Sequence, residues 1–537
     1  MLDLVLINPA SRTQVYQSLG QRLASIENPV WAGLMAEFAR WQGLSVEIVD
    51  AEALGLSAEQ VAEEVASLNA RLAVVVVYGH QPSASTQIMP AARRTCQAIK
   101  DLLPDQPILL TGGHVAALPQ RTLEEEPADF VASGEGLWTI VELVAALKAS
   151  PRPAGKRGQV RFVRSTLRAV PAKRTRPLFP DLSRVRGLWY RQEDAVRSTR
   201  AAPLATDLNQ QLPGIGCDLL PMDRYRAHNW HCFGGHERQP YAAIYTTLGC
   251  PYHCSFCCIQ APFKAGEQAA GHKPGVNSYR FWSPQHVIGL IDKLVIEHGV
   301  RNIKIADEMF VLNRRHVAAI CDLIIERGYE LNLWAYARVD TVHDALLDKL
   351  AQAGFRWLAF GIESASEQVR DGVDKRFDQQ QIFTTLNKVR AAGIHVIGNY
   401  IFGLPDDDRD SMQATLDLAL DLNCEFANFY TTMAYPGSPL YQQVLASGWP
   451  LPEAWSGYSQ HAVDTRPLPT AHLTSDEVLA FRDAAFHTYF RDPRYRDMIR
   501  RTFGAETLRQ VDEMSAHTLT RRNQGSGVRH QVLCPDT

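Results

Sequence analysis

Three cysteines stand close together near the middle of the chain, directly after an apolar segment. Cys250, Cys254 and Cys257 have C-x3-C-x2-C spacing, and Cys258 follows them. Short spacers of this kind let one loop wrap an iron–sulfur cubane, whose irons are held by cysteine thiolates. Three thiolates leave one of the four irons open. The spacing therefore predicts a [4Fe–4S] cluster with a free coordination site for a further ligand.

A structural zinc site is the alternative for the same cysteines. Structural zinc normally takes four ligands, often as two closely spaced pairs of cysteine or histidine. Cys258 or His253 could supply a fourth ligand, but no second pair follows nearby. We therefore favour the cluster, and a zinc-stabilised binding module is the competing hypothesis from another functional class.

The segments around the cysteines predict a parallel barrel. From residue 241 to 454, apolar strand-like segments alternate with amphipathic helical ones, which is the pattern of consecutive βα units. Six such units predict a partial (β/α)6 barrel, whose active site should lie at the carboxyl ends of the strands. The expected strands are 243–247, 302–305, 331–336, 357–361, 396–401 and 426–431.

The flanking segments predict further units. Residues 1–148 alternate five strands (2–7, 46–49, 72–78, 108–110 and 130–131) with helices, which favours an α/β domain with a doubly wound parallel sheet. Residues 149–240 are rich in proline and arginine and read as a linker segment with a hairpin at 187–200. Residues 455–537 predict a small, mainly helical region with a helix at 475–490 and a disordered tail.

The composition and the apolar runs argue against a nucleic-acid-binding protein and against a secreted or membrane-spanning protein. The chain has 537 residues, of which 46% are hydrophobic, enough for more than one core. A net charge of −3 gives no broad phosphate-binding surface, so nucleic acid is not expected as a partner. The N-terminus lacks the features of a secretion signal, and the longest apolar run is far shorter than the roughly 20 residues of a membrane helix. We expect a cytoplasmic protein without a membrane span.

The cysteine loop, placed after the first strand of a βα series, resembles that of radical S-adenosylmethionine (SAM) enzymes. Polar residues after later strands match this family in order and spacing. Asp307 and Glu308 resemble the acidic motif that binds the SAM amino group. Arg338 resembles the arginine that meets the SAM carboxylate, which suits a bidentate guanidinium. The remaining expected SAM contacts are Glu363, Ser364 and Asn399.

This resemblance implies a specific reaction at the cluster. In the family, the amino and carboxylate groups of SAM chelate the open iron, and an electron from the cluster cleaves the sulfonium to give a 5′-deoxyadenosyl radical. It also implies a small-molecule substrate and a reductant such as flavodoxin or ferredoxin.

A doubly wound domain ahead of such a core resembles the cobalamin (B12)-binding subgroup, which includes the class B methyltransferases. In that subgroup a corrinoid lies between the two domains. Glycines in the loops at the carboxyl ends of the strands permit close approach of the backbone to a flat macrocycle. The expected cobalamin contacts are Asn8, Gln81, Ser83, Ser85, Thr86, Gly112, Gly113, His114, Ser133, Gly134, Glu135 and Gly136.

One loop departs from the classical cobalamin carriers, which use D-x-H-x-x-G after the first strand. Here that loop begins with Asn8 and lacks the motif. The most similar segment, residues 50–55, follows the second strand and has Glu52 in place of the histidine. We therefore expect base-off cobalamin without a histidine ligand, although His80 could approach its lower face. A nucleotide-binding Rossmann domain is the alternative, weakened by the absence of G-x-G-x-x-G after the first strand.

The two cofactors together imply methyl transfer to an unactivated carbon of a small molecule. The radical would remove a hydrogen atom, and methylcobalamin would supply the methyl group, restored from a second SAM. An oxidase or cyclase that uses both cofactors without methyl transfer is the alternative. The sequence assigns no catalytic side chain and no substrate. Trp334, Tyr430, Tyr435 and the segment 222–233 could line the substrate pocket, although packing is the commoner role of such residues.

Overall fold

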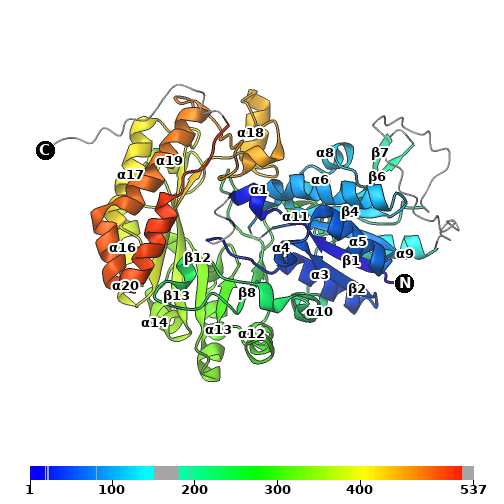
Figure 1. Cartoon of the computed structure of the whole chain (residues 1–537), viewed down its shortest axis with the longest axis horizontal. Coiled ribbons are helices and arrows are strands. Elements are labelled where there is room, and N and C mark those ends of the chain that lie inside the picture. Colours follow the sequence, from blue (N-terminus) through cyan, green and yellow to red (C-terminus); the bar gives the residue numbers. More distant parts are fainter. Residues whose placement is uncertain (18–19, 21–22, 80, 150–180, 194, 523–537) are drawn as a thin grey trace.

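The computed structural model describes residues 1–17, 20, 23–79, 81–149, 181–193 and 195–522. Figure 1 shows two α/β units side by side, an N-terminal unit in blue and cyan and a larger unit in green and yellow. The C-terminal helices, in orange and red, lie against the larger unit. The expectations for His80 and for the C-terminal tail concern residues outside the described ranges.

The N-terminal unit is built on a seven-stranded sheet with the order β2-β1-β3-β4-β5-β6-β7. Its first five strands are parallel. They are mostly buried, as expected for apolar runs covered by helices on both faces. The predicted doubly wound sheet is confirmed. The five strands are β1 (Leu4–Asn8), β2 (Val46–Asp50), β3 (Leu72–Val77), β4 (Ile108–Gly112) and β5 (Phe130–Ala132).

Alternate side chains of these strands pack into two separate layers, because successive residues of a strand point to opposite faces. Leu6 belongs to the layer formed with α3 and α9, and the adjacent Ile7 belongs to the layer formed with α5 and α6. The helices of this unit are α1 (Arg12–Tyr16), α3 (Val30–Trp41), α4 (Ala51–Leu54), α5 (Ala58–Leu68), α6 (Ala84–Leu102), α7 (Gly113–Ala117), α8 (Pro119–Glu125) and α9 (Leu137–Ala149).

The predicted hairpin in the linker segment is confirmed and extends the N-terminal sheet. Strands β6 (Leu188–Gln192) and β7 (Ala195–Ser198) pair antiparallel, and β6 also pairs antiparallel with β5. The hairpin thereby covers an edge that would otherwise expose unpaired backbone groups. The same segment carries α10 (Leu208–Gln211) and three short 3-10 helices at Cys217–Leu219, Met222–Arg224 and Trp230–Cys232 (η3). The domain boundaries given above stay predictions.

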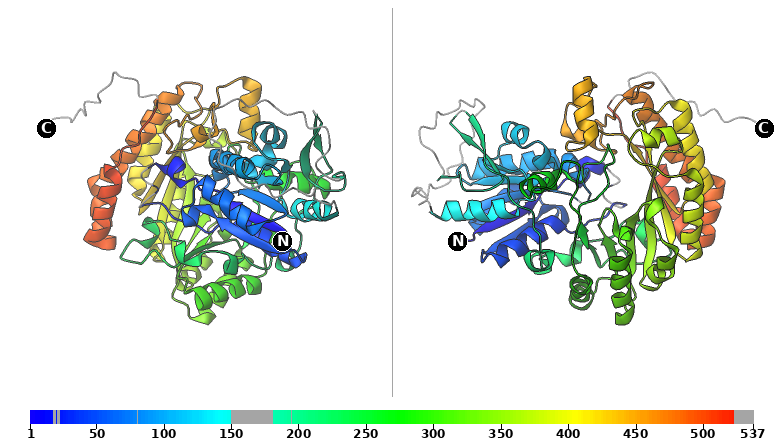
Figure 2. Two further views of the ribbon diagram at one scale, coloured as in Figure 1. Left: turned by 45° about the vertical axis from the view of Figure 1, so that its right-hand side comes forward. Right: turned by 180° about the vertical axis from the view of Figure 1, so that it is seen from behind.

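The larger unit is a six-stranded parallel sheet with the order β15-β14-β13-β12-β11-β8. Figure 2 shows the sheet curving around an interior, with helices on its outer side. The predicted partial barrel is confirmed, and it is open between β8 and β15. Its strands are β8 (Tyr241–Ile244), β11 (Asn302–Ile305), β12 (Asn332–Ala337), β13 (Phe355–Glu363), β14 (His395–Phe402) and β15 (Phe426–Thr431).

The helices of the barrel follow the strands in the order expected for βα units. They are α12 (Pro284–His298), α13 (Arg314–Arg327), α14 (Asp344–Gln352), α15 (Glu367–Asp371), α16 (Gln379–Ala391), α17 (Arg409–Leu422) and α18 (Pro439–Ser447). The loop after β8 carries a short antiparallel pair, β9 (Thr247–Leu248) with β10 (Arg280–Phe281), and α11 (Ala261–Ala269) between them.

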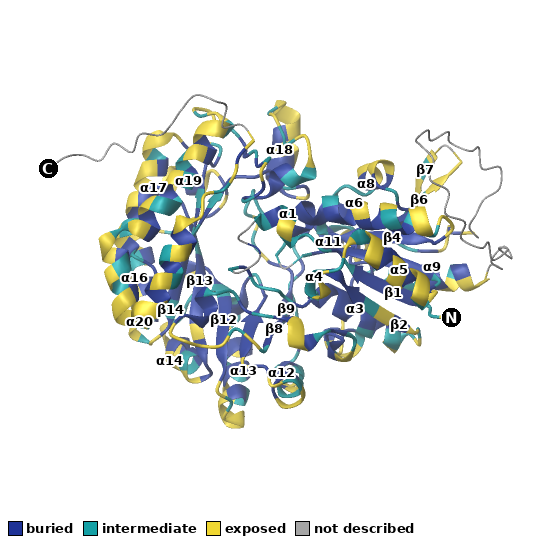
Figure 3. Cartoon of the chain, in the orientation of Figure 1, coloured by how far each residue is buried: buried dark blue, intermediate teal, exposed yellow. Residues whose placement is uncertain are grey.

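Two long C-terminal helices pack beside the last strand of the barrel. The predicted helix at 475–490 is confirmed as α19 (Ser475–Arg491), which begins at Thr474 with a capping box formed with Glu477. Helix α20 (Pro493–Ala516) follows and is interrupted at Gly504, whose φ is 89°. Figure 3 shows dark, buried strands inside both units and exposed residues on the outer helices. Among the described residues, no helix has the length and apolar content needed to cross a membrane.

Candidate active site

The cysteine loop leaves the barrel at the carboxyl end of β8 and is held by buried hydrogen bonds. The backbone N–H of Cys250 donates to Oε1 of Gln260 at 3.0 Å, and Nε2 of Gln260 donates to Glu267 at 2.7 Å. Gly249 precedes the first cysteine with φ 89°, and a Cβ there would lie 2.2 Å from the carbonyl oxygen of Ser278. Only glycine fits this approach without strain. The loop is thus fixed in place.

The structure brings the thiols to one end of the barrel. Cys250 and Cys257 line a cavity of about 280 Å³, which we call the cluster cavity. Sγ of Cys254 lies 3.7 Å from Nη1 of Arg338, which also lines this cavity. Cys258 instead lines a small adjoining cavity beside Trp31, which shares Gln81, Pro82, Ile259 and Glu308 with the cluster cavity. Two of the three predicted ligands therefore line the cluster cavity with Arg338, and the third contacts Arg338, whereas Cys258 does not line this cavity.

Burial sets the protonation state of these thiols. It raises the pKa of Cys250 to about 12 and also raises the pKa values of Cys254 and Cys257. Thiols must lose their protons to bind iron, so a metal must compete with protons here. Within the described ranges, no three His, Cys, Asp or Glu side chains converge on a point that a single ion could occupy. A cubane does not require such convergence, because each thiolate binds its own iron. The donor set fits a cluster.

The two acidic residues after β11 have different surroundings. Glu308 lines the cluster cavity, and burial raises the pKa of its carboxyl group to about 7. Asp307 is turned toward β8 and β9, where its carboxylate accepts hydrogen bonds from Thr246 and Thr247 at 2.5–2.8 Å. Burial raises the pKa of Asp307 to about 6. Glu308 is therefore placed to meet a cation in the cavity, whereas Asp307 braces the strands.

Arg338 and Glu363 both line the cluster cavity, and each already has an opposite charge beside it. Nε of Arg338 lies 2.9 Å from Asp340, and its guanidinium covers the ring of Tyr252 at 4.1 Å. Glu363 has a φ of 64° and is paired with Lys375, a contact that the sequence analysis missed. Lys375 follows a separate helix, so no local sequence signal marks it. Contact of Arg338 and Glu363 with SAM stays a prediction.

The two remaining residues predicted to bind SAM have different surroundings. The Ser364 side chain is fully buried, and its hydroxyl is 3.2 Å from that of Thr415, away from the cavity. Asn399 lines the cluster cavity and accepts a hydrogen bond from Nδ2 of Asn428 at 2.9 Å. Asn428 was also missed, because its partner is set by strand register. Contact of these residues with SAM stays a prediction.

The loop after β3 carries the N-terminal unit to the cluster cavity. Gln81 and Ser83 line the same cavity as Cys250 and Cys257, and so does Gln87, which the sequence analysis did not name. This is the carboxyl end of the N-terminal sheet, where ligands of doubly wound folds bind. The two halves of the predicted cofactor site therefore face each other across one cavity.

The neighbouring residues Ser85, Thr86 and His114 support one another instead. The hydroxyl of Ser85 donates to the carbonyl oxygen of Val77 and accepts from the backbone N–H of His114 at 2.8 Å. Thr86 lies 3.2 Å from Nδ1 of His114, and all three side chains are buried. These residues tie α6 to α7 beneath the cavity.

The other predicted cobalamin residues lie along the carboxyl edge of the sheet. Asn8 donates to Asp50 at 2.8 Å and lines a different small cavity. Gly112 approaches β3 so closely that a Cβ would lie 2.0 Å from the carbonyl oxygen of Val77. Gly113 lines the same small cavity as Cys258. Their contact with cobalamin stays a prediction.

The loop after β5 meets the barrel unit. Ser133 donates to the carbonyl oxygen of Gly187, and Gly136 has a φ of 86°. Glu135 accepts from the backbone N–H of Ala205 at 2.8 Å and pairs with Arg280 at 2.8 Å. At Gly134, a Cβ would lie 3.9 Å from the carbonyl oxygen of Pro262. This loop therefore joins the two units.

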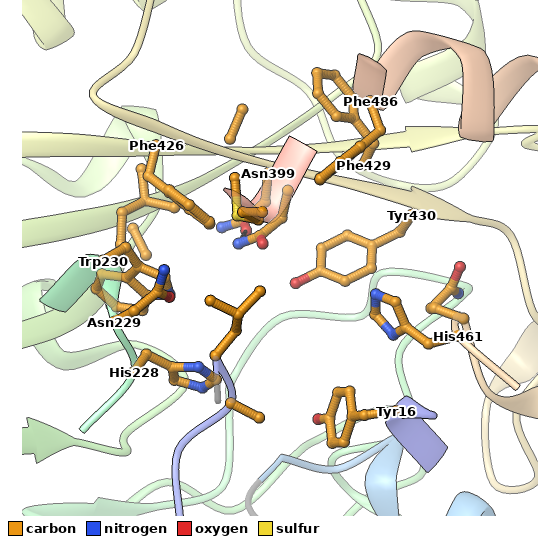
Figure 4. A pocket seen from close by; sticks show the side chains of 18 of the residues that line it. Tyr16, His228, Asn229, Trp230, Asn399, Phe426, Phe429, Tyr430, His461 and Phe486 are labelled. Atoms are coloured by element: carbon orange, nitrogen blue, oxygen red, sulfur yellow. Dashed lines mark hydrogen bonds between the residues drawn. The ribbon is translucent and has the colours of Figure 1, made fainter. Parts of the chain in front are cut away.

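A second cavity of about 230 Å³ opens inside the barrel, and we call it the barrel cavity. Figure 4 shows Trp230, Tyr430 and His461 around it. It shares seven lining residues with the cluster cavity, namely Gln81, Gln87, Tyr336, Ala359, Asn399, Tyr430 and Gln460. The two cavities are thus contiguous. Of the aromatic residues named from the sequence, Trp334 and Tyr430 line the barrel cavity, and Tyr430 and Tyr435 line the cluster cavity.

Comparison with protein families agrees with this arrangement. Residues 244–419 match the radical SAM superfamily, and residues 17–144 match the B12 binding domain. The chain therefore carries a radical SAM domain and a cobalamin-binding domain. It is a radical SAM enzyme, and its cofactors are a [4Fe–4S] cluster, SAM and cobalamin. The expected family, fold and cofactors are confirmed.

Named relatives include a methyltransferase and a cyclase. The radical SAM chain is 25% identical to an uncharacterized methyltransferase from Pyrococcus horikoshii, over 92% of this chain and 94% of that protein. It is also 25% identical to an anaerobic magnesium-protoporphyrin IX monomethyl ester cyclase from Cereibacter sphaeroides, over 80% of this chain but only 62% of the cyclase. Sequence identity alone therefore does not separate the two reactions.

A solved structure shares the fold. The cobalamin-dependent SAM radical enzyme OxsB, with aqua-cobalamin and SAM bound, superimposes with a TM-score of 0.67 at 14% identity. The match covers 96% of this chain and 72% of that one. At this identity the comparison concerns the fold, which extends over both units.

Proposed function

We propose that this radical SAM enzyme transfers a methyl group to an unactivated carbon of a small molecule. One observation carries the proposal. Gln81 and Ser83 of the cobalamin-binding domain line the same cavity as Cys250 and Cys257 of the cluster loop, and this cavity continues into the barrel cavity. A substrate in the barrel cavity would therefore lie next to both cofactors, as a methyl transfer that uses both requires.

When bound, SAM with the cluster supplies a hydrogen-abstracting radical, and cobalamin supplies a methyl group. The chain's own residues bind, orient and shield. Glu308 offers a carboxylate to the SAM amino group, and a cation beside it would lower the raised pKa of Glu308. Arg338 offers a guanidinium to the SAM carboxylate from its place beside Cys254. The buried junction around Glu135 limits the entry of water from the side of the N-terminal domain.

Two further components belong to this proposal. The chain needs a one-electron reductant such as flavodoxin or ferredoxin, and its substrate is a small molecule. We place the reaction in the cytoplasm, where cysteines of such a loop stay reduced.

A cyclase or oxidase that uses the same cofactors is the second candidate. The similarity to a magnesium-protoporphyrin IX monomethyl ester cyclase over 80% of this chain favours it. The volume of the barrel cavity, about 230 Å³, lies below the usual range of about 300–1,000 Å³ for drug-sized ligands and favours a smaller substrate.

Isotope labelling separates the two reactions. The protein, reconstituted anaerobically with its cofactors, is incubated with a reductant, a bacterial metabolite extract and SAM that carries a deuterated methyl group. Methyl transfer predicts a product that contains the deuterated methyl group and that is absent with the Cys254→Ala variant. Consumption of a metabolite with formation of 5′-deoxyadenosine but no labelled product would favour the cyclase.

A further inference from the structure

Two asparagine side chains form a pair inside the barrel cavity. Asn399 on β14 and Asn428 on β15 are register partners, and Nδ2 of Asn428 donates to Oδ1 of Asn399 at 2.9 Å. Both line the barrel cavity. Among the described residues, neither the amide nitrogen of Asn399 nor the amide oxygen of Asn428 has a hydrogen-bond partner in the protein. The pair therefore leaves the amide NH2 group of Asn399 and the amide oxygen of Asn428 available to a ligand in the cavity.

This pattern does not depend on how the two amides are oriented. An amide–amide contact uses one oxygen and one N–H group, whichever residue supplies each. If both side chains were flipped, Asn428 would present the donor and Asn399 the acceptor. Either way, one amide of the pair offers its NH2 group and the other offers its carbonyl oxygen.

The walls around this edge are aromatic. Phe426, Asn428 and Tyr430 alternate along β15, so their side chains share one face of the strand. Figure 4 shows Phe426 and Trp230 on one side of the cavity and Tyr430 on the other. Trp230 also lies edge-on to Trp334, with ring centroids 5.1 Å apart. Such walls suit a planar ligand, which offers them a large apolar face.

The charged groups in the lining are already paired. Lys304 lies 3.0 Å from Glu27. Arg482 lies 2.9 Å from Asp483, and Arg521 holds Asp483 from its other side at 2.9 Å. Each of these charges already lies within 3.0 Å of an opposite charge, so an ionised ligand would gain little from them to offset its own desolvation. The lining therefore favours an uncharged ligand.

Further polar groups are available to such a ligand. The hydroxyl of Tyr430 points into the cavity in Figure 4 and has no hydrogen-bond partner in the described part of the chain. Nη2 of Arg482 lies 3.3 Å from Nε2 of His461. Because arginine only donates, Nε2 accepts, and the ring proton of neutral His461 lies on Nδ1. Nδ2 of Asn229, across the cavity, is buried and has no hydrogen-bond partner among the described residues. The cavity thus adds hydrogen-bonding groups to its aromatic walls.

We propose that the barrel cavity binds an uncharged, planar substrate with a lactam-type edge, an N–H beside a C=O, and that Asn399 and Asn428 read this edge. Lactams, ureides and nucleobases present such an edge. The assignment rests on the proposed function, because it names the substrate class of that site. It also reassigns Asn399, predicted above as a SAM contact, to the border between SAM and substrate.

Binding of small probes to the cofactor-loaded protein tests this inference. Ligand-observed NMR titrations compare 2-pyridone, which carries the N–H and C=O edge, with N-methyl-2-pyridone, in which the donor is blocked. We expect 2-pyridone to bind at least about tenfold more tightly, since a blocked N–H leaves a polar group of the site unpaired. Equal affinity for the two probes, or no binding of 2-pyridone, would overturn the inference.

Substitutions of the two asparagines test whether they cause the preference for 2-pyridone over N-methyl-2-pyridone. Asn428→Leu and Asn399→Leu should each bring the two affinities to within about twofold. Asn428→Asp keeps the shape of the asparagine side chain. If Asn399 then donates to the new carboxylate, the free groups of the pair are two acceptor oxygens. This variant should therefore prefer protonated 2-aminopyridine, which presents two N–H donors. Phe486→Leu is the matched control, because it alters the wall but not the edge and should leave the preference for 2-pyridone unchanged. Selectivity that persists in all three asparagine variants would contradict the proposal.

This test is independent of catalysis. A chain that transfers no methyl group would still show the binding preference if the edge is read as proposed. A chain that labels a product with the deuterated methyl group, but binds both pyridones equally, would keep the proposed function and lose this substrate class.

Discussion

The fold gathers the cysteine thiols at one end of the barrel and keeps them protonated. Burial raises the pKa of Cys250 to about 12, so the thiol stays protonated until a metal displaces the proton. Arg338 lies beside Cys254 and opposes this effect, since a nearby cation lowers the pKa of a thiol. The site is therefore poised for metal rather than for thiol chemistry.

Two cysteine substitutions should differ sharply. Cys254→Ala leaves two thiolates, which cannot hold the cluster, so the reconstituted protein should lose most of its iron and sulfide and the visible absorbance of the cluster. Cys258→Ala should keep them, because Cys258 does not line the cluster cavity. Iron and sulfide analysis with absorption spectra checks both. Loss of the cluster in Cys258→Ala alone would show that the wrong thiols have been assigned.

The buried pair of Glu363 and Lys375 gives a second prediction at this scale. Both side chains are only 7% exposed. Lys375→Met would leave the carboxylate of Glu363 buried without its partner and should lower the free energy of unfolding by about 3–5 kcal/mol. The double variant Glu363→Gln with Lys375→Met should recover much of this loss. Urea unfolding measures both, and equal stability of the two variants would argue against the pair.

At the scale of elements, the helix η3 joins the linker segment to the barrel. Trp230 packs against Trp334 and Trp357. His231 is fully buried, and its Nε2 lies 2.9 Å from the carbonyl oxygen of Asn332 at the start of β12. This contact requires a proton on Nε2, because a carbonyl oxygen only accepts. The neutral and the protonated ring can both donate in this way, so it is burial, and not this hydrogen bond, that favours neutral His231.

The contribution of His231 to the free energy of unfolding should depend on pH. Burial lowers the pKa of His231 to about 3, while Asn332 and Glu27 act in the opposite direction and His236 lowers it further. Because this value lies below the unfolded value of about 6.5, the unfolded chain binds the proton first and stability falls as the pH falls. From pH 7 to 5 this histidine should cost about 2 kcal/mol. His231→Gln should lose less over the same range, and equal losses in urea unfolding would refute this.

The positions of the parallel strands could be predicted from the sequence, but the pairing between distant segments could not. Buried parallel strands appear as continuous apolar runs, so all eleven parallel strands were expected close to their observed positions. The pairing of β6 with β5 and the Asn399–Asn428 pair were not expected, because register between distant segments leaves no local signal. Met514 and Leu519 line the barrel cavity from the end of the described chain, far in sequence from the cysteines.

For the whole molecule, the important feature is the junction of the two units. Nη2 of Arg280 lies 2.8 Å from Glu135, and its guanidinium covers the ring of Phe263 at 4.9 Å. Nη1 of Arg280 donates to the carbonyl oxygen of Ala205. One side chain thus links the loop after β5, the linker segment and the barrel. Its role was invisible in the sequence, where the arginine is one of many.

Loss of this link should loosen the cobalamin site. Arg280→Met leaves Glu135 buried without its partner, and we expect both a lower melting temperature and less cobalamin retained per chain after gel filtration. Arg184→Met, which changes an exposed arginine, is the matched control and should retain cobalamin like the unaltered protein. Full retention of cobalamin in Arg280→Met would show that the junction does not support the site.

Formation of 5′-deoxyadenosine tests most directly whether the cysteine loop generates a radical from SAM. The protein is reconstituted anaerobically with iron, sulfide and hydroxocobalamin and then incubated with SAM and a reductant. We expect 5′-deoxyadenosine with the unaltered chain and none with Cys254→Ala. A chain that holds its full cluster and cobalamin, yet forms no 5′-deoxyadenosine with any reductant or metabolite extract supplied, would contradict the central claim that this loop generates a radical from SAM.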